Sequence, residues 1–167
     1  VMNLDDKRIQ FTPDVLPSDL TGFAMYDKTP GTFQYHEGAV HTNLFLADEI
    51  NRTSPKTQSA LLEVMEEGHV TVDGVTYDLP APFLVLATQN PIGASGTQKL
   101  PESQLDRFMI RLSMGYPDHS SAISVLKGDS HRIIRNLETV LTTDDILKMQ
   151  EDCEKVHVSD SMYEYAV

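Results

Sequence analysis

A run of apolar residues that ends in two adjacent acids is the feature of this sequence that most constrains its fold. It spans residues 43–49 and reads Asn-Leu-Phe-Leu-Ala-Asp-Glu. A short, continuously apolar segment is typical of a strand that is buried on both faces of a parallel sheet. The carboxylates of Asp48 and Glu49 then follow the C-terminal end of that strand, where open α/β sheets bind ligands. Taken alone, the run is also compatible with a core strand followed by a solvated acidic turn.

The composition of the chain excludes several classes of site. Its formal net charge is −12 and its Lys and Arg residues form no cluster, which argues against binding nucleic acid or an anionic membrane. Cys153 is the only cysteine, so an intrachain disulfide and a cysteine metal cage are excluded, and a reducing cytoplasm is the expected location. No stretch of the sequence approaches the roughly 18 consecutive apolar residues of a membrane span.

Apolar runs elsewhere in the chain predict further strands. We expect them at residues 8–12, 83–88 and 108–112, in addition to the strand at residues 44–47. A polar residue, Asn90, closely follows the run at residues 83–88, just as Asp48 and Glu49 follow the run at residues 44–47. The sequence therefore predicts a sheet with several polar groups near the ends of its strands.

Turn and cap residues predict a helix and a hairpin between these strands. Ser54 and Pro55 are typical of a helix start, since the hydroxyl caps the first turn and the proline needs no N–H there. Apolar residues then recur at helical spacing until Gly68, which predicts the stop. The dipeptide Asp73-Gly74 between two valine-containing segments predicts a two-residue hairpin turn.

The last quarter of the chain has a helical pattern. From Asp118 onward the apolar residues are spaced as in helices, and the composition changes near Gly128. We therefore expect an α/β domain at residues 1–128 and the beginning of a helical lid domain at residues 129–167.

Four strings of the sequence carry a family resemblance. They are LFLADEINR, PKTQSALLEVMEEG, LATQNPI and LPESQLDRF, and their order and spacing resemble those of the MoxR family of AAA+ ATPases. The resemblance extends from RIQFTPDVLPSDLTG to VHVSDSMYEYAV, which is nearly the whole chain. It implies a three-layer α/β core with a parallel sheet, the P-loop NTPase fold. It also makes the Asp73-Gly74 hairpin the pre-sensor 1 hairpin, and residues 23–40 the insertion in helix 2 of this branch.

The resemblance implies roles for four residues at an ATP site. Asp48 becomes the Walker B acid on the Mg²⁺ side, and Glu49 becomes the catalytic base. Asn90 becomes the sensor 1 amide that positions the attacking water, and with both acids it lines the nucleotide site. Arg107 matches the arginine finger, which in this family reaches the γ-phosphate bound by a neighbouring subunit. ATP and Mg²⁺ are the implied cofactors.

Physical chemistry agrees with these roles and leaves simpler ones open. Phosphoryl transfer to water needs a metal, a group that holds the water and a cation near the developing charge. Taken singly, Asn90 is also compatible with a turn before Pro91, and Arg107 with a surface ion pair to Asp106. The residues just after Glu49 are compatible either with contacts to nucleotide or a neighbouring subunit, or with an ion pair at a helix start. These residues are Asn51, Arg52 and Lys56.

Two motifs of the family do not occur in the sequence. These are the glycine-rich phosphate loop with its lysine and the arginine of sensor 2. We therefore expect a piece of a longer protein that does not hydrolyse ATP by itself. The family places the strand that leads into the phosphate loop between the strands matched by residues 83–88 and 108–112. We expect residues 8–12, 44–47 and 83–88 to be adjacent and parallel, with either another chain or residues 108–112 filling the gap.

The family resemblance implies a chaperone-like function. Related proteins hydrolyse ATP in rings, most often hexamers, and use the motion to remodel or mature other protein complexes. A protein with a von Willebrand factor A domain is the expected partner, together with a client complex. Two alternatives stay open: a nucleotide-independent assembly module, and an AAA+ activator of transcription, although the GAFTGA loop of those activators is absent from the sequence.

Overall fold

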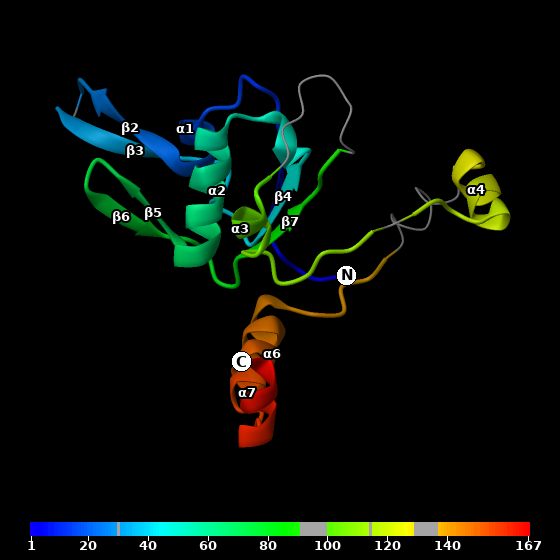
Figure 1. Ribbon diagram of the computed structural model, residues 1–167. Coiled ribbons are helices and arrows are strands. Elements are labelled where there is room, and N and C mark those ends of the chain that lie inside the picture. Colours follow the sequence, from blue (N-terminus) through cyan, green and yellow to red (C-terminus); the bar gives the residue numbers. More distant parts are fainter. Residues whose placement is uncertain (30, 91–99, 114, 129–136) are drawn as a thin grey trace.

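A three-stranded parallel sheet forms the centre of the molecule (Figure 1). The computed structural model describes residues 1–29, 31–90, 100–113, 115–128 and 137–167. The strands lie in the order β1 (Asp6–Gln10), β4 (Leu44–Asp48) and β7 (Leu84–Ala87), and both pairs of neighbours are parallel. Because the register is level, the C-terminal ends of all three strands meet at one edge of the sheet.

One face of this sheet is covered by helix α2 (Pro55–Glu67). The Ser54 side chain accepts a hydrogen bond from the N–H of Thr57, and Gly68 ends the helix with a φ of 69°. Both features confirm the start and the stop expected from the sequence. The buried core joins apolar side chains of the helix to those of the central strand, and its members include Leu61, Val64, Phe45 and Ala47.

Two antiparallel hairpins extend from the same side of the molecule (Figure 1). The first pairs β2 (Gly22–Asp27) with β3 (Thr32–Glu37) and follows the short helix α1 (Pro17–Thr21). The second pairs β5 (His69–Val72) with β6 (Val75–Asp78). Asp73 and Gly74 form its turn with positive φ, as a two-residue hairpin requires. Tyr35 of the first hairpin stacks on Tyr77 of the second, with ring centroids 3.8 Å apart.

The remaining elements are short and lie around or away from the sheet. They are η1 (Ile50–Arg52), α3 (Glu102–Leu105), α4 (His119–Leu126), α6 (Thr143–Glu154) and α7 (Asp160–Ala166). In Figure 1, α4 and the pair α6 and α7 extend from the body that contains the sheet. The segment before α6 returns to the N-terminus, where the N–H of Asn3 donates to the carbonyl of Leu141 at 2.8 Å. No helix in the described part of the chain is both long enough and apolar enough to cross a membrane.

The structure confirms the α/β class with an incomplete parallel sheet and corrects some of its details. The first strand lies two residues earlier than expected, and the strand expected at residues 108–112 does not form. Met109 and Leu112 are almost fully exposed, at 98% and 85%. In the ranges that the structure covers, residues 108–112 do not fill the gap beside β7, so this expected filling is wrong. A strand is stable only when a neighbouring strand satisfies its backbone N–H and C=O groups. In these ranges β7 pairs only with β4, so no strand connects residues 108–112 to the sheet.

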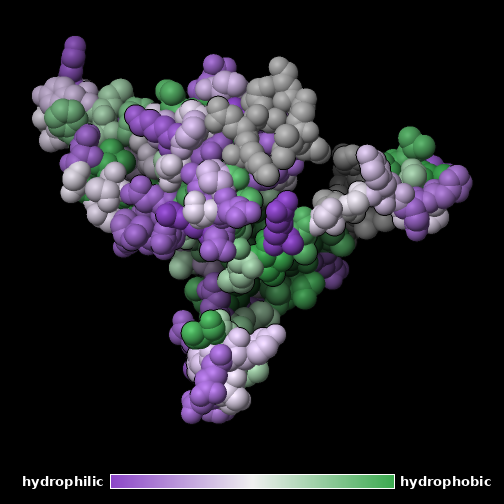
Figure 2. Space-filling view, viewed as in Figure 1, coloured by the Kyte–Doolittle hydropathy of each residue, from purple (hydrophilic) through white to green (hydrophobic). Residues whose placement is uncertain are grey.

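The central strand is buried on one face and not, as expected, on both. Phe45 and Ala47 are fully buried, whereas Leu44 and Leu46 are half-buried. On the neighbouring strand, Leu86 is 58% exposed. Figure 2 shows hydrophobic surface between the lower end of the sheet and the C-terminal helices. A helix layer thus covers one face of the sheet, and the apolar residues of the other face stay in contact with solvent.

Candidate functional site

The site forms where the three parallel strands end. Asp48 is the last residue of β4, Glu49 follows it, and Asn90 lies three residues beyond the end of β7. The side-chain amide of Asn90 donates from Nδ2 to Oε1 of Glu49 at 2.8 Å. Asp48, Glu49 and Asn90 are up to 42 positions apart in the sequence. They lie together because the C-terminal ends of neighbouring parallel strands meet at one edge of the sheet.

The hydroxyl of Thr88 fixes both acids at once. It donates to Oδ1 of Asp48 at 2.5 Å and accepts the backbone N–H of Glu49 at 2.9 Å. The chain then turns sharply, because Glu49 adopts a left-handed conformation with a φ of 57°. A non-glycine residue in this region costs of order 1–3 kcal/mol and persists only where surrounding contacts hold it. Thr88 supplies one such contact, and the 3₁₀ turn η1 supplies the next.

Each acid is paired with an arginine from a different element. Nη2 of Arg8, on the edge strand β1, lies 2.5 Å from Oδ2 of Asp48. Nη1 of Arg52, in η1, lies 2.7 Å from Oε2 of Glu49, and Nε2 of Gln10 makes a longer contact of 3.5 Å with the same oxygen. Both oxygens of both carboxylates thus have a hydrogen-bond donor.

These donors keep both carboxylates ionised. The hydrogen bond from Arg8, followed by that from Thr88, lowers the pKa of Asp48 below its ordinary value. The hydrogen bond from Arg52 is the largest cause that lowers the pKa of Glu49, with smaller contributions from Gln10 and Asn90. At neutral pH the edge of the sheet therefore carries two negative charges that can accept hydrogen bonds or hold a cation.

The comparisons with known proteins place this chain in a family. Residues 1–110 match the sequence model of the family described as "ATPase family associated with various cellular activities (AAA)". The chain is 42% identical to the protein named "Chaperone MoxR1" of Mycobacterium tuberculosis over 163 residues, which are 96% of this chain and 42% of that protein. The chain belongs to the MoxR family of AAA+ ATPases.

Two other relatives support this membership. The chain is 52% identical over 164 residues to "Uncharacterized protein YeaC" of Bacillus subtilis, covering 98% of this chain and 51% of that protein. A crystal structure of a candidate ATPase from Cytophaga hutchinsonii superposes with a TM-score of 0.80 at 44% identity, covering 98% of this chain and 50% of that one. The chain spans about half the length of these relatives.

Arg107 lies apart from Asp48, Glu49 and Asn90. Its Nη1 atom is 2.8 Å from Oε2 of Glu66 near the end of α2, and both side chains are well exposed. The alternative interpretation of the sequence, a surface ion pair between Arg107 and Asp106, is wrong for the described residues, because Arg107 pairs with Glu66 instead. In the described ranges, no hydrogen bond or ion pair connects Arg107 to Asp48, Glu49 or Asn90.

Two of the residues that follow Glu49, Asn51 and Arg52, form contacts within the site. Arg52 forms the ion pair with Glu49, which agrees with the helix-start alternative, and Lys56 is exposed. Asn51 is 2% exposed, and its amide forms two hydrogen bonds with the backbone of Asn90.

The described residues form no closed metal cage, but Asp48 could contribute to a Mg²⁺ site that is shared with a nucleotide. In the described residues, no three His, Cys, Asp or Glu side chains group together. Mg²⁺ bound with a nucleotide usually takes one or two protein carboxylates, and phosphate and water oxygens fill the other positions. Asp48, with Thr88 beside it, fits such a minimal protein contribution.

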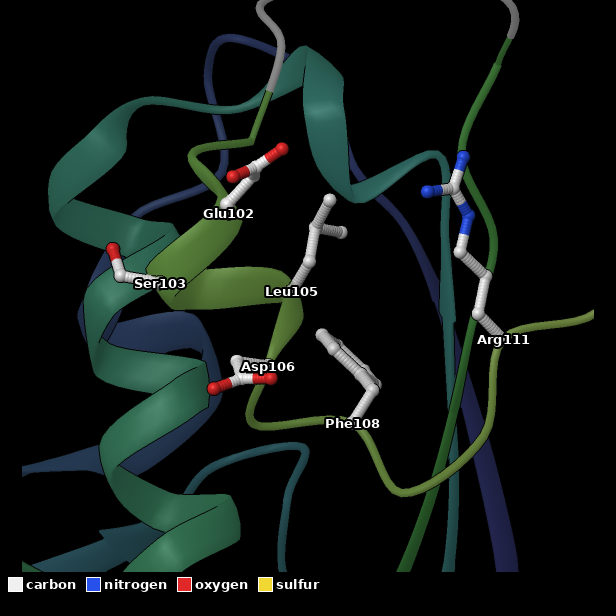
Figure 3. A pocket seen from close by; sticks show the side chains of 6 residues that line it. All are labelled: Glu102, Ser103, Leu105, Asp106, Phe108 and Arg111. Atoms are coloured by element: carbon white, nitrogen blue, oxygen red, sulfur yellow. The ribbon is translucent and has the colours of Figure 1, made fainter. Parts of the chain in front are cut away.

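A separate hollow lies under α3 and contains none of the predicted site residues. It has a volume of about 460 Å³ and is lined by Glu102, Ser103, Leu105, Asp106, Phe108 and Arg111. Figure 3 shows Leu105 and Phe108 close together, with Arg111 facing them from the opposite side. The same two apolar side chains pack against the core, so the hollow is a gap between α3 and the segment that follows it.

Sequence reasoning missed three members of the site: Arg8, Gln10 and Thr88. The first two share one side of β1 because strand side chains alternate, and Gln10 lies in register with Asp48. This alternation was the available signal, but using it required the register of β1 against β4. Thr88 directly follows the apolar run of β7, as Asp48 and Glu49 end that of β4.

Proposed function

We propose that this chain forms the Walker B and sensor 1 half of an ATP-hydrolysing site. The observation that carries the proposal is the hydrogen bond between Asn90 and Glu49 beside Asp48, at the C-terminal edge of a parallel sheet, in a chain of the MoxR family. In this proposal Asp48 contributes the protein ligand to Mg²⁺, and the bound metal neutralises charge on the phosphate oxygens.

Glu49 and Asn90 handle the attacking water in this proposal. Glu49 is ionised and can accept a proton or a hydrogen bond from water, while its pairing with Arg52 limits where the carboxylate points. The Asn90 amide has a second N–H and a carbonyl oxygen besides the hydrogen used on Glu49. It can therefore hold water and carboxylate in one fixed geometry, which is the form of catalysis that phosphoryl transfer requires.

Arg107 is proposed to act on the site of a neighbouring subunit. Its side chain is 44% exposed and, in the described residues, forms one exposed ion pair, which is weak enough to exchange for another partner. This proposal requires a ring, and we propose a hexamer.

For the full-length protein we propose a chaperone-like role in remodelling or maturing other protein complexes in the cytoplasm. The relative from Mycobacterium tuberculosis is named a chaperone, which supports this role. A protein with a von Willebrand factor A domain is the proposed partner, and neither nucleic acid nor a membrane is a proposed ligand.

The test is ATP hydrolysis by the full-length protein that contains this chain. We expect Mg²⁺-dependent phosphate release that is lost in Glu49→Gln, and a nucleotide-dependent ring in light-scattering measurements. Wild-type protein that binds no nucleotide would refute the proposal. It would favour the second candidate, an assembly module that works without nucleotide. One observation favours that candidate: Arg8 and Arg52 form ion pairs with the two acids that a metal would otherwise need.

A further inference from the structure

We propose that Asn51 is a positioning residue that holds Asn90 in place against Glu49. The proposal deepens the function proposed above and rests on it, because it concerns the same hydrolytic site. From the sequence, Asn51 is equally compatible with a contact to nucleotide, and the structure points to a different role. Its side chain acts on the backbone of Asn90, and the side chain of Asn90 acts on Glu49.

The amide of Asn51 pairs with the backbone of Asn90 through two reciprocal hydrogen bonds. Nδ2 of Asn51 donates to the carbonyl oxygen of Asn90 at 3.0 Å, and Oδ1 of Asn51 accepts the N–H of Asn90 at 3.0 Å. This is the pattern by which two residues of an antiparallel ladder exchange both backbone groups. A primary amide has its donor and its acceptor on one side, so it can imitate a neighbouring strand at a single residue.

Asn90 needs such a partner because it lies beyond the sheet. The ladder between β4 and β7 ends at Ala87, and the last backbone contacts continue to Thr88. Two residues further on, the backbone bonds of Asn90 found in the described part of the chain are those to Asn51. The two hydrogen bonds from Asn51 therefore fix the backbone of Asn90 beyond the end of the ladder, and the side chain of Asn90 donates to Glu49.

The turn that carries Asn51 is itself anchored on both sides. The N–H of Ile50 donates to the carbonyl of Thr88 at 3.0 Å. The buried amide of Gln58, on α2, donates to the carbonyls of Ile50 and Thr53 at 3.1 and 3.2 Å. Since Asn51 is 2% exposed and both of its polar groups are used, it is not placed to contact a nucleotide. It is a rigid part of the support and lies outside the reacting groups.

The experiment compares Asn51→Ala with Asn43→Ala in the full-length protein. Asn43 is the matched control, because it is also buried and donates to a backbone carbonyl, that of Pro82, at the opposite end of β4. We expect Asn51→Ala to lower kcat about tenfold or more, while the affinity for a fluorescent ATP analogue changes less than about threefold. Asn43→Ala should leave kcat within about threefold of wild type at a comparable loss of thermal stability.

A double variant separates positioning from a general structural effect. If Asn51 acts through Asn90, then adding Asn90→Ala to Asn51→Ala lowers kcat no more than about threefold below the lower single variant. Should Asn51→Ala fail to fold, Asn51→Asp keeps the size and the acceptor, loses the donor, and should still lower kcat.

Hydrogen exchange provides a readout that is independent of activity. The N–H of Asn90 should exchange faster in Asn51→Ala than in wild type, whereas its exchange rate in Asn43→Ala should equal that of wild type.

Three results would overturn the proposal. They are an unchanged kcat in the Asn51 variants, losses that multiply in the double variant, and a fall in nucleotide affinity that accounts for the lost activity. These results are distinct from failure of the proposed function, in which wild-type protein does not hydrolyse ATP. In that case the hydrogen exchange of Asn90 still decides whether Asn51 holds its backbone.

Discussion

Replacing Glu49 by glutamine in the full-length protein removes the proposed base with little change in shape. The carboxylate accepts from Arg52 Nη1 at 2.7 Å and from Asn90 Nδ2 at 2.8 Å, through different oxygens. Glutamine has one oxygen, so it can accept from one of these donors and must turn its own NH₂ group toward the other. The variant thus loses the negative charge and separates residue 49 from either Arg52 or Asn90.

The expected loss of turnover is about a hundredfold or more, because a positioned general base contributes about 10²–10⁴-fold. The affinity for Mg·ATP should change less than about threefold, since Asp48 is the proposed metal ligand and the loss of a carboxylate does not weaken attraction to an anion. Turnover and binding should therefore separate, which is the signature of a group that acts in the transition state.

The assay is phosphate release at saturating Mg·ATP, combined with titration of a fluorescent ATP analogue. Glu67→Gln is the matched control, because it makes the same change of charge at an exposed position at the end of α2. A loss of less than about tenfold in Glu49→Gln would refute its role as the base. An equal loss in the Glu67 control would show that the effect comes from charge alone.

Three further predictions concern single elements of the proposal. Arg107→Ala should abolish hydrolysis, and part of the activity should return when this variant is mixed with subunits whose phosphate-loop lysine is replaced. If no activity returns in rings that are shown to exchange subunits, Arg107 does not act in trans. The 167-residue chain alone should not bind Mg·ATP with micromolar affinity in titration calorimetry, because the glycine-rich loop that would contact the phosphates is absent from its sequence. Arg52→Ala should raise the pKa of Glu49 toward its ordinary value of 4.5, since Arg52 is the main cause that lowers it. In the wild type the lowered pKa of Glu49 contributes stability above pH 4.5 that is lost as the pH falls through the lowered pKa, and Arg52→Ala should remove this contribution. A carboxyl-carbon NMR titration of Glu49 that is unchanged from wild type would exclude this role of Arg52.

The sequence predicts best the features that depend on neighbouring residues. Ser54, Pro55 and Gly68 bound α2 as expected, and Asp73-Gly74 forms the expected turn, because caps and tight turns are decided within a few positions. The apolar runs of β4 and β7 also form strands, and the acids follow the first of them. These local signals were sufficient to predict where the candidate site begins.

Features that depend on distant partners could not be predicted in this way. Residues 108–112 have the composition of a strand, but a strand also needs a ladder partner, and composition does not report whether one is present. The pairing of Arg8 with Asp48 joins residues 40 positions apart and depends on the register of two strands. The family resemblance assigned chemistry to the acids, but the arginines that hold them became visible only with the register.

The origin of the two arginines determines how the acids respond to ligands. Arg8 comes from the edge strand β1, whereas Arg52 comes from the turn η1, three residues after the acid that it holds. Asp48 can offer Oδ2 to a cation only if the guanidinium of Arg8 turns away or shares that oxygen, and the Arg8 side chain is 59% exposed. Such a movement leaves the pair between Arg52 and Glu49 intact, because each arginine bonds to a different carboxylate. In the proposed site, a metal could thus bind Asp48 while Asn90, Arg52 and the turn keep Glu49 in place, which is the preorganisation that its proposed water-orienting role requires.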